Sequence, residues 1–244
     1  MRVAVISDIH ANLHALEAVL AAVEEAQPDA IWNLGDTVGY GPRPNQCCAV
    51  ARERAAVNLV GNHDLAVLGG GDVAVEDFNP EAAAAALWTR ETLTDDARGF
   101  LQALDASSSA DGVELYHGSP RDPVWEYVLT VEAARASLEL TRAPLVLVGH
   151  SHVPLALRLR NDEIDGGLAP AGTKVDLASG RWLLNPGSVG QPRDGDPRAA
   201  FCLVDLAQRN ATFLRVDYPV GETQSEMREH GLPPALAERL AYGA

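Results

Sequence analysis

Side chains that can bind metal ions recur at five separated points of the 244-residue chain, each directly after a short and largely apolar run. They are Asp8 with His10, Asp36, Asn62 with His63 and Asp64, His117, and His150 with His152. Imidazole and carboxylate donors without cysteine suit Mn, Fe, Co, Ni or Zn better than a structural zinc–cysteine site or a calcium cage. These donors are too many for one ion. The pattern therefore predicts two divalent ions roughly 3.5–4 Å apart, bridged by a carboxylate.

Each of these residues taken singly has an ordinary structural explanation. An aspartate after a strand commonly forms a turn or a helix cap, and an asparagine after glycine commonly forms an Asx turn. Five successive segments that all end in such donors are hard to explain by turn chemistry alone. Residues two apart in extended backbone point to the same side, so Asp8 with His10, and His150 with His152, should each direct two donors at one site.

The elements that must position these donors alternate between strand and helix. Short apolar runs predict strands at 3–6, 31–34, 57–60, 113–116 and 145–148. Helical spacing follows Asn12, a candidate N-cap, and a second helix should follow the Gly- and Pro-rich loop 39–44 and run to about Arg54. This order is typical of α/β architecture, in which ligands gather at the carboxyl ends of parallel strands.

A helical segment at about 72–105 is expected inside this domain, after a loop at Gly69–Gly71 and before a turn at Ser107–Gly112. Asn79 and Pro80 are a typical N-cap and first residue for its main helix. Its alanine-rich face with Leu87 and Trp88 is expected to pack into the core. The alternative is that the segment flanks the site and limits the size of a substrate.

The later part of the chain has the spacing of antiparallel hairpins, with expected strands at 155–160, 181–184, 200–204 and 212–216. Residues 222–244 are expected to form one or two short surface helices. With no linker composition between the halves, we expect a single domain over 1–244 of mixed α/β (α+β) class.

Composition limits the class of function. With 34 Asp+Glu against 19 Lys+Arg, the net charge of −15 argues against a basic face for long nucleic acid and against polybasic membrane binding. No apolar run is long enough to predict a membrane span, and the N-terminus lacks a signal-peptide pattern. Three cysteines (Cys47, Cys48 and Cys202) cannot form a disulfide framework, so a reducing, cytoplasmic location is expected. The sequence carries no signal for an oligomeric state.

Taken in order, five motifs resemble those of the calcineurin-like metallophosphoesterase superfamily: Asp8-Ile-His10, Gly35-Asp36, Gly61-Asn62-His63-Asp64, His117 and Gly149-His150-Ser151-His152. The resemblance implies a four-layer β-sandwich flanked by helices, and two divalent ions, Mn first with Fe, Zn, Ni and Co as alternatives. It implies one ion held by Asp8, His10, Asp36 and His152, and a second held by Asp36, Asn62, His117 and His150. It also implies that His63 faces the substrate as a proton donor oriented by Asp64.

The implied activity is hydrolysis of a phosphate ester by a hydroxide that bridges the two ions. Phosphoprotein phosphatases of this superfamily carry an arginine after the second motif and another before the third; this chain has Val38 and Val60 near those places. The chain instead resembles the compact prokaryotic phosphodiesterase-like branch in its loop Gly39-Tyr40-Gly41-Pro42 and in the segment Asn185–Gly190. This resemblance implies small phosphodiesters or nucleotides as substrates. The missing arginine pair, which grips a phosphomonoester dianion, agrees with it. The alternatives are a phosphomonoesterase, acting on nucleotides or phosphoproteins, and a protein-binding scaffold like the retromer subunit of this fold.

Substrate contacts are expected from Asn62 and His63, and from two loop arginines, Arg43 and Arg193. The turn Asn185–Ser188 is expected to shape the pocket without taking part in the chemistry. Aromatic residues could also stack on a nucleobase, the candidates being Tyr40, Trp88, Trp125 and Tyr127, although both tryptophans are expected in the core.

Overall fold

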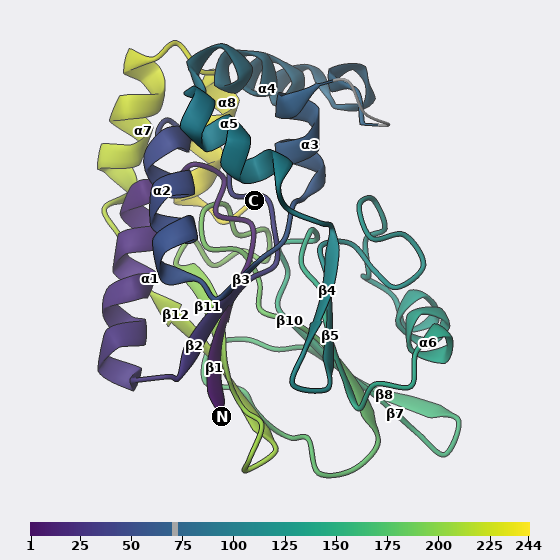
Figure 1. Ribbon diagram of the computed structural model, residues 1–244. Helices are drawn as coiled ribbons and strands as arrows, with labels where there is room; N and C mark the ends of the chain where they lie inside the picture. Colours follow the sequence, from purple (N-terminus) through teal and green to yellow (C-terminus); the bar gives the residue numbers. More distant parts are fainter. Residues whose placement is uncertain (70–72) are drawn as a thin grey trace.

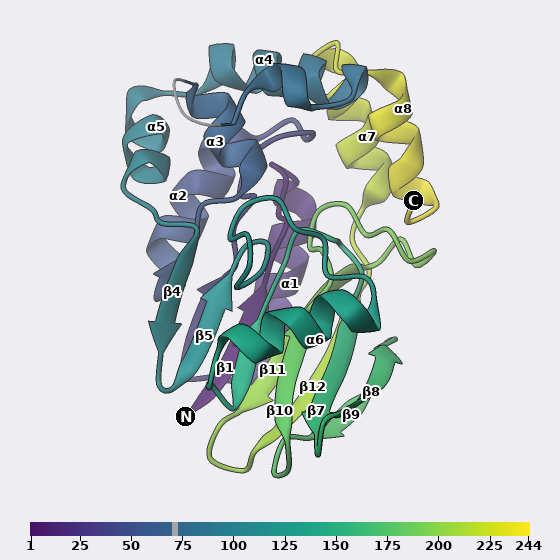
Figure 2. The same cartoon turned by 90° about the vertical axis from the view of Figure 1, so that its right-hand side faces the viewer.

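The structure, a computed structural model, describes residues 1–69 and 73–244. Two six-stranded sheets pack face to face, and helices cover their outer faces (Figures 1 and 2). This is the four-layer sandwich expected from the sequence. The strand order of the first sheet is β3 (Val57–Asn58), β2 (Ala30–Asn33), β1 (Arg2–Ile6), β11 (Ala199–Asp205), β12 (Asn210–Val216) and β9 (Lys174–Asp176). The second has the order β4 (Ser107–Ala110), β5 (Val113–Tyr116), β6 (Leu145–Leu147), β10 (Arg181–Asn185), β7 (Leu155–Arg160) and β8 (Glu163–Leu168).

Parallel pairing involves the strands that precede the five motifs and one further strand, β10. β1 pairs in parallel with β2, and β2 with β3; β6 pairs in parallel with β5 and β10. The pairs β1–β11 and β10–β7 are antiparallel. The strands that precede the motifs therefore end at one edge of the sandwich.

Helices α1 (Leu13–Ala26) and α2 (Pro44–Arg54) cover the first sheet, and α6 (Val131–Leu140) covers the second (Figures 1 and 2). The Asn12 side chain accepts a hydrogen bond from the backbone N–H of Ala15 at 3.2 Å, which confirms the predicted N-cap of α1. Helical spacing places Leu16 and Val19 on the face that packs against Phe201 of β11. Between the sheets lies a separate apolar layer built from alternate strand residues, including Val5, Leu147 and Phe213.

The other helices lie beyond the motif-bearing edge, where Figure 2 shows α4, α7 and α8 at the same end of the molecule. Their bounds are α3 (Asn62–Leu68), η1 (Val75–Asp77), α4 (Pro80–Thr92), α5 (Asp95–Gln102), α7 (Val220–Glu229), α8 (Pro234–Glu238) and η2 (Arg239–Ala241). Met227, Leu236 and Leu240 are buried against Ala82 and Ala85 of α4, so 220–241 forms a cap with a core of its own.

Two local predictions were wrong, and two strands were not predicted. Residues 107–110 form the edge strand β4, not a turn, and the turn is the shorter Asp111–Gly112 that joins β4 to β5. The serines of β4 give no apolar alternation, so only pairing with β5 makes them a strand. Strands β8 and β9 were also missed, because their residues show no regular alternation of apolar and polar side chains. Leu87 is 48% exposed and does not belong to the core. The loop expected at 69–71 and the start of the helical segment at Asp72 lie outside the described residues, apart from Gly69.

Candidate metal centre

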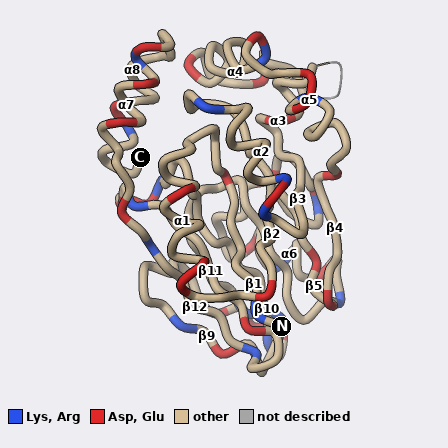
Figure 3. Tube along the Cα trace, turned by 60° about the vertical axis from the view of Figure 1, so that its left-hand side comes forward, with Lys and Arg blue, Asp and Glu red and all other residues tan. Residues whose placement is uncertain are grey.

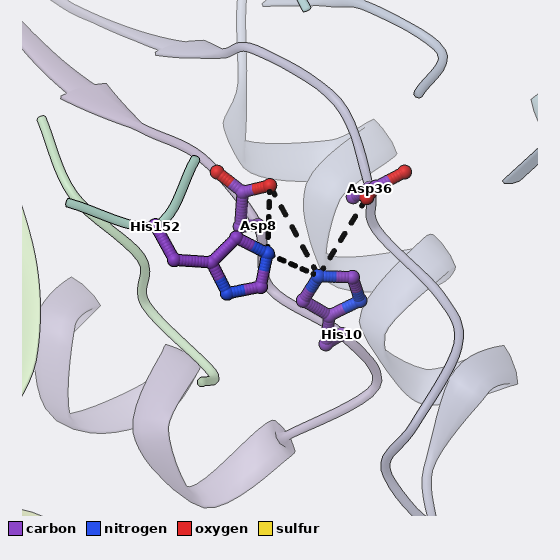
Figure 4. Close-up of side chains that lie close together, drawn as sticks. All are labelled: Asp8, His10, Asp36 and His152. Atoms are coloured by element: carbon purple, nitrogen blue, oxygen red, sulfur yellow. Dashed lines mark hydrogen bonds and ion pairs between the residues drawn. The ribbon is translucent and has the colours of Figure 1, made fainter. Parts of the chain in front are cut away.

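One group of four ligand side chains comes from three loops at the motif-bearing edge. One donor atom from each of Asp8, His10, Asp36 and His152 lies within 4.8 Å of the others, and all four residues are buried. The His10 Nε2 atom lies 3.1 Å from His152 Nε2 and 3.6 Å from Asp36 Oδ2. His152 Nε2 lies 3.4 Å from Asp8 Oδ1. Figure 4 shows the two imidazoles and two carboxylates directed toward one point.

A second group shares Asp36 with the first. One donor atom from each of Asp36, His117 and His150 lies within 4.8 Å of the others, and all three residues are buried. His117 Nε2 lies 3.5 Å from Asp36 Oδ2 and 3.1 Å from Asn62 Oδ1. Two groups with one common carboxylate are the arrangement that a pair of bridged divalent ions requires.

Each of these four histidines uses one ring nitrogen for a backbone carbonyl and keeps the other for the centre. The pairs are His10 Nδ1 with Val38 O (3.1 Å), His117 Nδ1 with Leu34 O (2.9 Å), His152 Nδ1 with Gln191 O (2.5 Å) and His150 Nε2 with Trp125 O (3.1 Å). An N–H donated to a carbonyl fixes the tautomer and leaves a lone pair on the other nitrogen, as in metal-binding histidines generally.

The two carboxylates are held in the same way. Asp8 Oδ2 accepts the N–H of His150 at 3.1 Å, and Asp36 Oδ1 accepts the N–H of His63 at 2.9 Å. The second oxygens, Asp8 Oδ1 and Asp36 Oδ2, are buried and have no hydrogen-bond partner among the described residues. A buried carboxylate oxygen without a donor is costly, and a cation at the shared point would satisfy both. The residues present therefore fit two divalent ions.

Burial also perturbs the protonation of the centre. It raises the pKa of Asp8 to about 7 and that of Asp36 well above its ordinary range, with the neighbouring Asp64 adding to the latter. It lowers the pKa of His10 and His152 well below the usual value, so these imidazoles are neutral and able to act as ligands.

The backbone presents the ligands differently from the sequence expectation. Asp8, His10, Asp36, His150 and His152 are not extended: their φ angles are +54°, +49°, +52°, +62° and +58°. Left-handed backbone at residues other than glycine is strained and clusters at functional sites, where the surroundings enforce it. Here loop-to-loop bonds do so, among them His10 N–H to Asp36 O at 2.9 Å and Gly190 N–H to Asp8 O at 2.9 Å. Ser188 Oγ donates to the same Asp8 carbonyl at 2.8 Å, in keeping with a shaping role for the turn Asn185–Ser188.

Two glycines of the motifs are required because other side chains approach their Cα atoms too closely to leave room for a Cβ. A Cβ on Gly61 would overlap Asp36 Oδ1, and a Cβ on Gly149 would overlap Ser7 Oγ and lie 3.3 Å from Asp8 Oδ2. A side chain at Gly61 would displace the Asp36 carboxylate, and a side chain at Gly149 would displace the Ser7 hydroxyl beside Asp8.

His63 lies at the floor of a cleft next to the centre, with 4% of its surface exposed. Its ring packs against those of His10, Tyr40 and Phe78 at centroid distances of 4.9, 4.4 and 4.6 Å, and its Nδ1 has no hydrogen-bond partner among the described residues. Burial lowers the pKa of His63 well below its usual value, so the ring is neutral at neutral pH.

The expected orienting role of Asp64 toward His63 is not seen. Within the described chain, no hydrogen bond or ion pair joins the Asp64 carboxylate to the His63 ring. Instead Asp64 accepts the backbone N–H groups of Thr37 (3.2 Å), Val38 (2.9 Å) and Gly61 (3.0 Å). A carboxylate that takes these three donors fixes the loop after β2 against the loop after β3, so Asp64 positions both loops and the ligands they carry.

The cleft has a volume of about 340 Å³ and mixes aromatic, amide and basic groups. Its lining residues are Tyr40, Asn62, His63, Asp77, Phe78, Asn79, Trp125, Tyr127, Arg193 and Arg239. Trp125 is therefore a wall of the cleft and not a core residue, whereas Trp88 packs on His230 at 5.3 Å between ring centroids, away from it. Phe78 and Asn79, just before α4, line the cleft, so this part of the helical segment flanks the site; a limit on the size of a substrate stays a prediction. Arg239 was missed because no strand end or motif marks it.

Of the two loop arginines expected at the substrate, Arg193 lines the cleft and Arg43 does not. The Arg43 guanidinium forms a two-pronged ion pair with Glu226 of α7, with Nε 2.7 Å from Oε2. This ion pair holds the cap against the N-terminus of α2. Arg43, which we expected from the sequence to contact the substrate, therefore has a structural role.

Replacing Glu226 with Gln, or Arg43 with Met, is expected to lower the free energy of unfolding by about 1 kcal/mol at neutral pH, a modest value because the Arg43 side chain is 39% exposed. In a chain of this length the melting temperature falls by about 2–4 °C. Arg43 holds the pKa of Glu226 below its usual range, so the stabilisation exists above the ordinary glutamate pKa and disappears as the pH falls through the lowered value.

Urea unfolding of both single variants and the double variant, at neutral pH and in acid, checks this coupling. We expect the double variant to match the single ones at neutral pH, and all variants to approach the parent in acid. Full additivity of the two losses would contradict the pairing.

Comparisons with known proteins agree with the two-sheet fold and the paired ligand groups. The family model described as the calcineurin-like phosphoesterase superfamily domain matches residues 1–209. An uncharacterized protein of Methanocaldococcus jannaschii is 36% identical over 247 residues, covering 99% of this chain and 98% of the relative. A crystal structure of a metallophosphoesterase from Sphaerobacter thermophilus superposes with a TM-score of 0.90 at 42% identity, covering 100% of this chain and 99% of the other. A hypothetical protein from Pyrococcus horikoshii shares the fold, with a TM-score of 0.82 at 21% identity and coverage of 100% and 98%.

The two-sheet sandwich and the paired ligand groups agree with the metallophosphoesterase fold class. The chain belongs to the calcineurin-like phosphoesterase superfamily. In the part of the chain that the structure describes, no helix combines the length and apolarity needed to cross a membrane.

Proposed function

We propose that this protein is a phosphodiesterase that hydrolyses small phosphodiesters or nucleotides with two divalent ions, Mn²⁺ being the first candidate. The observation that carries the proposal is the pair of buried ligand groups that share Asp36, beside a cleft of about 340 Å³. Two such ions act as Lewis acids on phosphoryl oxygens and supply an activated water. Asp8, His10, Asp36 and His152 would hold one ion, and Asp36, Asn62, His117 and His150 the other.

The chain's own residues account for substrate binding. Asn62 and His63 form the cleft floor, next to where a scissile phosphate would lie. His63 would become protonated as the anion enters and would give its proton to the leaving oxygen. Phe78, Trp125 and Tyr127 offer aromatic faces on which a nucleobase can stack.

The size and charge of the site favour a small substrate. Figure 3 shows acidic and basic positions interspersed along the chain. Because the chain has 34 Asp+Glu against 19 Lys+Arg, a long polyanion would meet mostly repulsive charge. The three buried, unpaired cysteines support a cytoplasmic location.

A phosphomonoesterase is the second candidate, and one observation favours it. Arg193 and Arg239 line the cleft, so the chain has two arginines near the site although both sequence positions of the phosphatase arginine pair lack one. If these two arginines bind the doubly charged phosphate group of a monoester, the monoester is the better substrate.

Activity on bis(p-nitrophenyl) phosphate and p-nitrophenyl phosphate separates the two candidates. We expect the Mn²⁺-loaded protein to have the larger kcat/KM on the diester, and chelation to abolish both activities. A larger kcat/KM on the monoester would reverse the assignment. If the protein hydrolyses neither the two aryl substrates nor any member of a nucleotide panel, both candidate functions are contradicted.

Metal binding can also be measured from the thermal stability of the protein, without an activity assay. An ion that binds only the folded chain stabilises it by RT ln(1 + [L]/Kd), about 2.7 kcal/mol at one hundred times Kd. We therefore expect the melting temperature of the chelated protein to rise by several degrees on titration with Mn²⁺. Mg²⁺ is expected to raise it less, because imidazole ligands suit the transition metals. No response to any divalent ion would contradict the metal site.

A further inference from the structure

The loop that joins β5 to α6, residues 118–129, supports one ligand of the second group although its own residues belong to none of the five motifs. It begins directly after the ligand His117, and the backbone carbonyl of Trp125 accepts a hydrogen bond from His150 Nε2 at 3.1 Å. The other three ligand histidines donate to carbonyls in the loops after β2 and β10. His150 is therefore the ligand histidine whose carbonyl partner comes from the 118–129 loop.

Tyr127 of this loop covers one face of the His150 ring. The two rings are stacked, with centroids 3.9 Å apart and 15° between their planes, the closest and most nearly parallel aromatic pair in the described part of the chain. Tyr127 is nevertheless 46% exposed. Its contact with His150 therefore bears on the metal centre more than on the packing of the core.

The hydrogen bond and the stacked ring restrict different motions of the His150 imidazole. The bond at Nε2 fixes the tautomer, leaves the lone pair on Nδ1 and sets the direction of the ring within its plane. The Tyr127 ring opposes a tilt out of that plane. An imidazole that binds a cation also becomes more positive, and the electron-rich face of a phenol ring attracts positive charge. Both contacts therefore favour the orientation that binds an ion through Nδ1.

The 118–129 loop is held in shape by its own hydrogen bonds. Asp122 Oδ1 accepts the backbone N–H groups of Val124 and Trp125, both at 3.0 Å. Ser119 Oγ accepts the N–H of Asp122 at 3.1 Å and donates to the Glu126 carboxylate. These bonds place the Trp125 carbonyl without a metal ion, so the support for His150 exists before an ion binds.

The loop supports the second group and not the first. Among the described residues, no hydrogen bond, ion pair or aromatic contact joins 118–129 to any of the four residues of the first group, which are Asp8, His10, Asp36 and His152. We propose that Tyr127 is a positioning residue for the second ion: by stacking on His150 it raises the affinity of that site and leaves the first site unaffected. A change in this loop then alters the occupancy of one ion only. This inference rests on the two-ion centre of the proposed function.

Substitutions of Tyr127, read by metal binding, test the inference without turnover. We expect Tyr127→Ala to weaken binding of Mn²⁺ at one of the two sites by about 10–100-fold, the usual effect of removing a group that orients a metal ligand. Tyr127→Phe keeps the stacked ring and is expected to bind as the parent does. Calorimetric titration of the chelated proteins with Mn²⁺ gives the two affinities. Metal analysis after dialysis should find two ions in the parent and Tyr127→Phe, and about one in Tyr127→Ala.

Leu129→Ala is the matched control, because Leu129 lies in the same loop, is 52% exposed and does not line the cleft. We expect it to retain both ions. Since both side chains are so exposed, chelated Tyr127→Ala should unfold at the same temperature as chelated Leu129→Ala.

The Asp8→Asn background assigns the loss to one site. Asp8 belongs to the first group only, and asparagine can still accept the His150 N–H that Asp8 Oδ2 accepts. Asp8→Asn is therefore expected to retain the second ion. Adding Tyr127→Ala should remove that ion, and adding Leu129→Ala should not.

Three results would overturn the inference. The first is unchanged affinity at both sites in Tyr127→Ala. The second is equal weakening of both sites, which would give Tyr127 a general structural role. The third is a loss in Tyr127→Phe as large as in Tyr127→Ala, which would exclude the stacked ring as the cause. A parent protein that binds no Mn²⁺ would instead contradict the proposed function itself.

Discussion

Asp36→Asn is expected to remove both metal ions and to reduce hydrolysis to background. Asp36 is the carboxylate shared by the two ligand groups. Its Oδ2, which has no hydrogen-bond partner in the described part of the chain, lies 3.6 Å from His10 Nε2 and 3.5 Å from His117 Nε2. Residues that merely support metal ligands cost roughly 10–100-fold in affinity or activity when changed, so loss of a bridging ligand should exceed ~10²-fold. Asparagine can still accept the His63 N–H through Oδ1, which keeps the loop in place.

Metal analysis after dialysis measures this directly. The parent should retain two ions per chain and Asp36→Asn fewer than one. Asp8→Asn is the matched control, because Asp8 belongs to one group only, and it should retain about one ion. Circular dichroism and the melting temperature of the chelated proteins separate metal loss from unfolding. Two ions retained by Asp36→Asn would contradict the shared-carboxylate arrangement.

His63→Gln is expected to keep both ions and to lose roughly 10²–10⁴-fold in turnover on a substrate with a poor leaving group, the usual worth of a positioned proton donor. His63 belongs to neither ligand group, yet it lines the cleft and its Nδ1 has no partner among the described residues. The loss should shrink for p-nitrophenyl esters, because p-nitrophenolate leaves without a proton.

Metal content, together with rates on an alkyl and an aryl diester, checks this prediction. Asp64→Asn is the contrasting variant: it weakens the acceptor that joins Thr37, Val38 and Gly61, so both substrates and metal retention should suffer together. Equal losses of His63→Gln on both leaving groups would contradict a proton-donor role, and loss of metal would assign His63 to the ligands.

The sequence by itself determined the architecture and the composition of the centre. Apolar runs ending in Asp8, Asp36, Asn62, His117 and His150 predicted strands that end at one edge. The two groups around Asp36 contain all of these donors except Asn62, whose Oδ1 lies 3.1 Å from His117 Nε2. These features can be predicted because a buried strand and the polar turn that follows it are encoded by adjacent residues. The N-cap Asn12 is predictable for the same reason.

Only the tertiary structure decided which charged and aromatic residues meet. Arg43 binds Glu226, 183 positions away, Asp64 braces two loops, and Arg239 reaches the cleft from the cap. Edge strand β4 likewise exists through its pairing with β5. The left-handed backbone of the ligands depends on hydrogen bonds between loops. The contacts of Arg43 and Arg239 leave no periodic trace, because their partners lie far along the chain and meet them only once the sheets and the cap have packed. Strand β4 leaves none because its serines do not alternate with apolar residues, although its partner β5 is close in sequence.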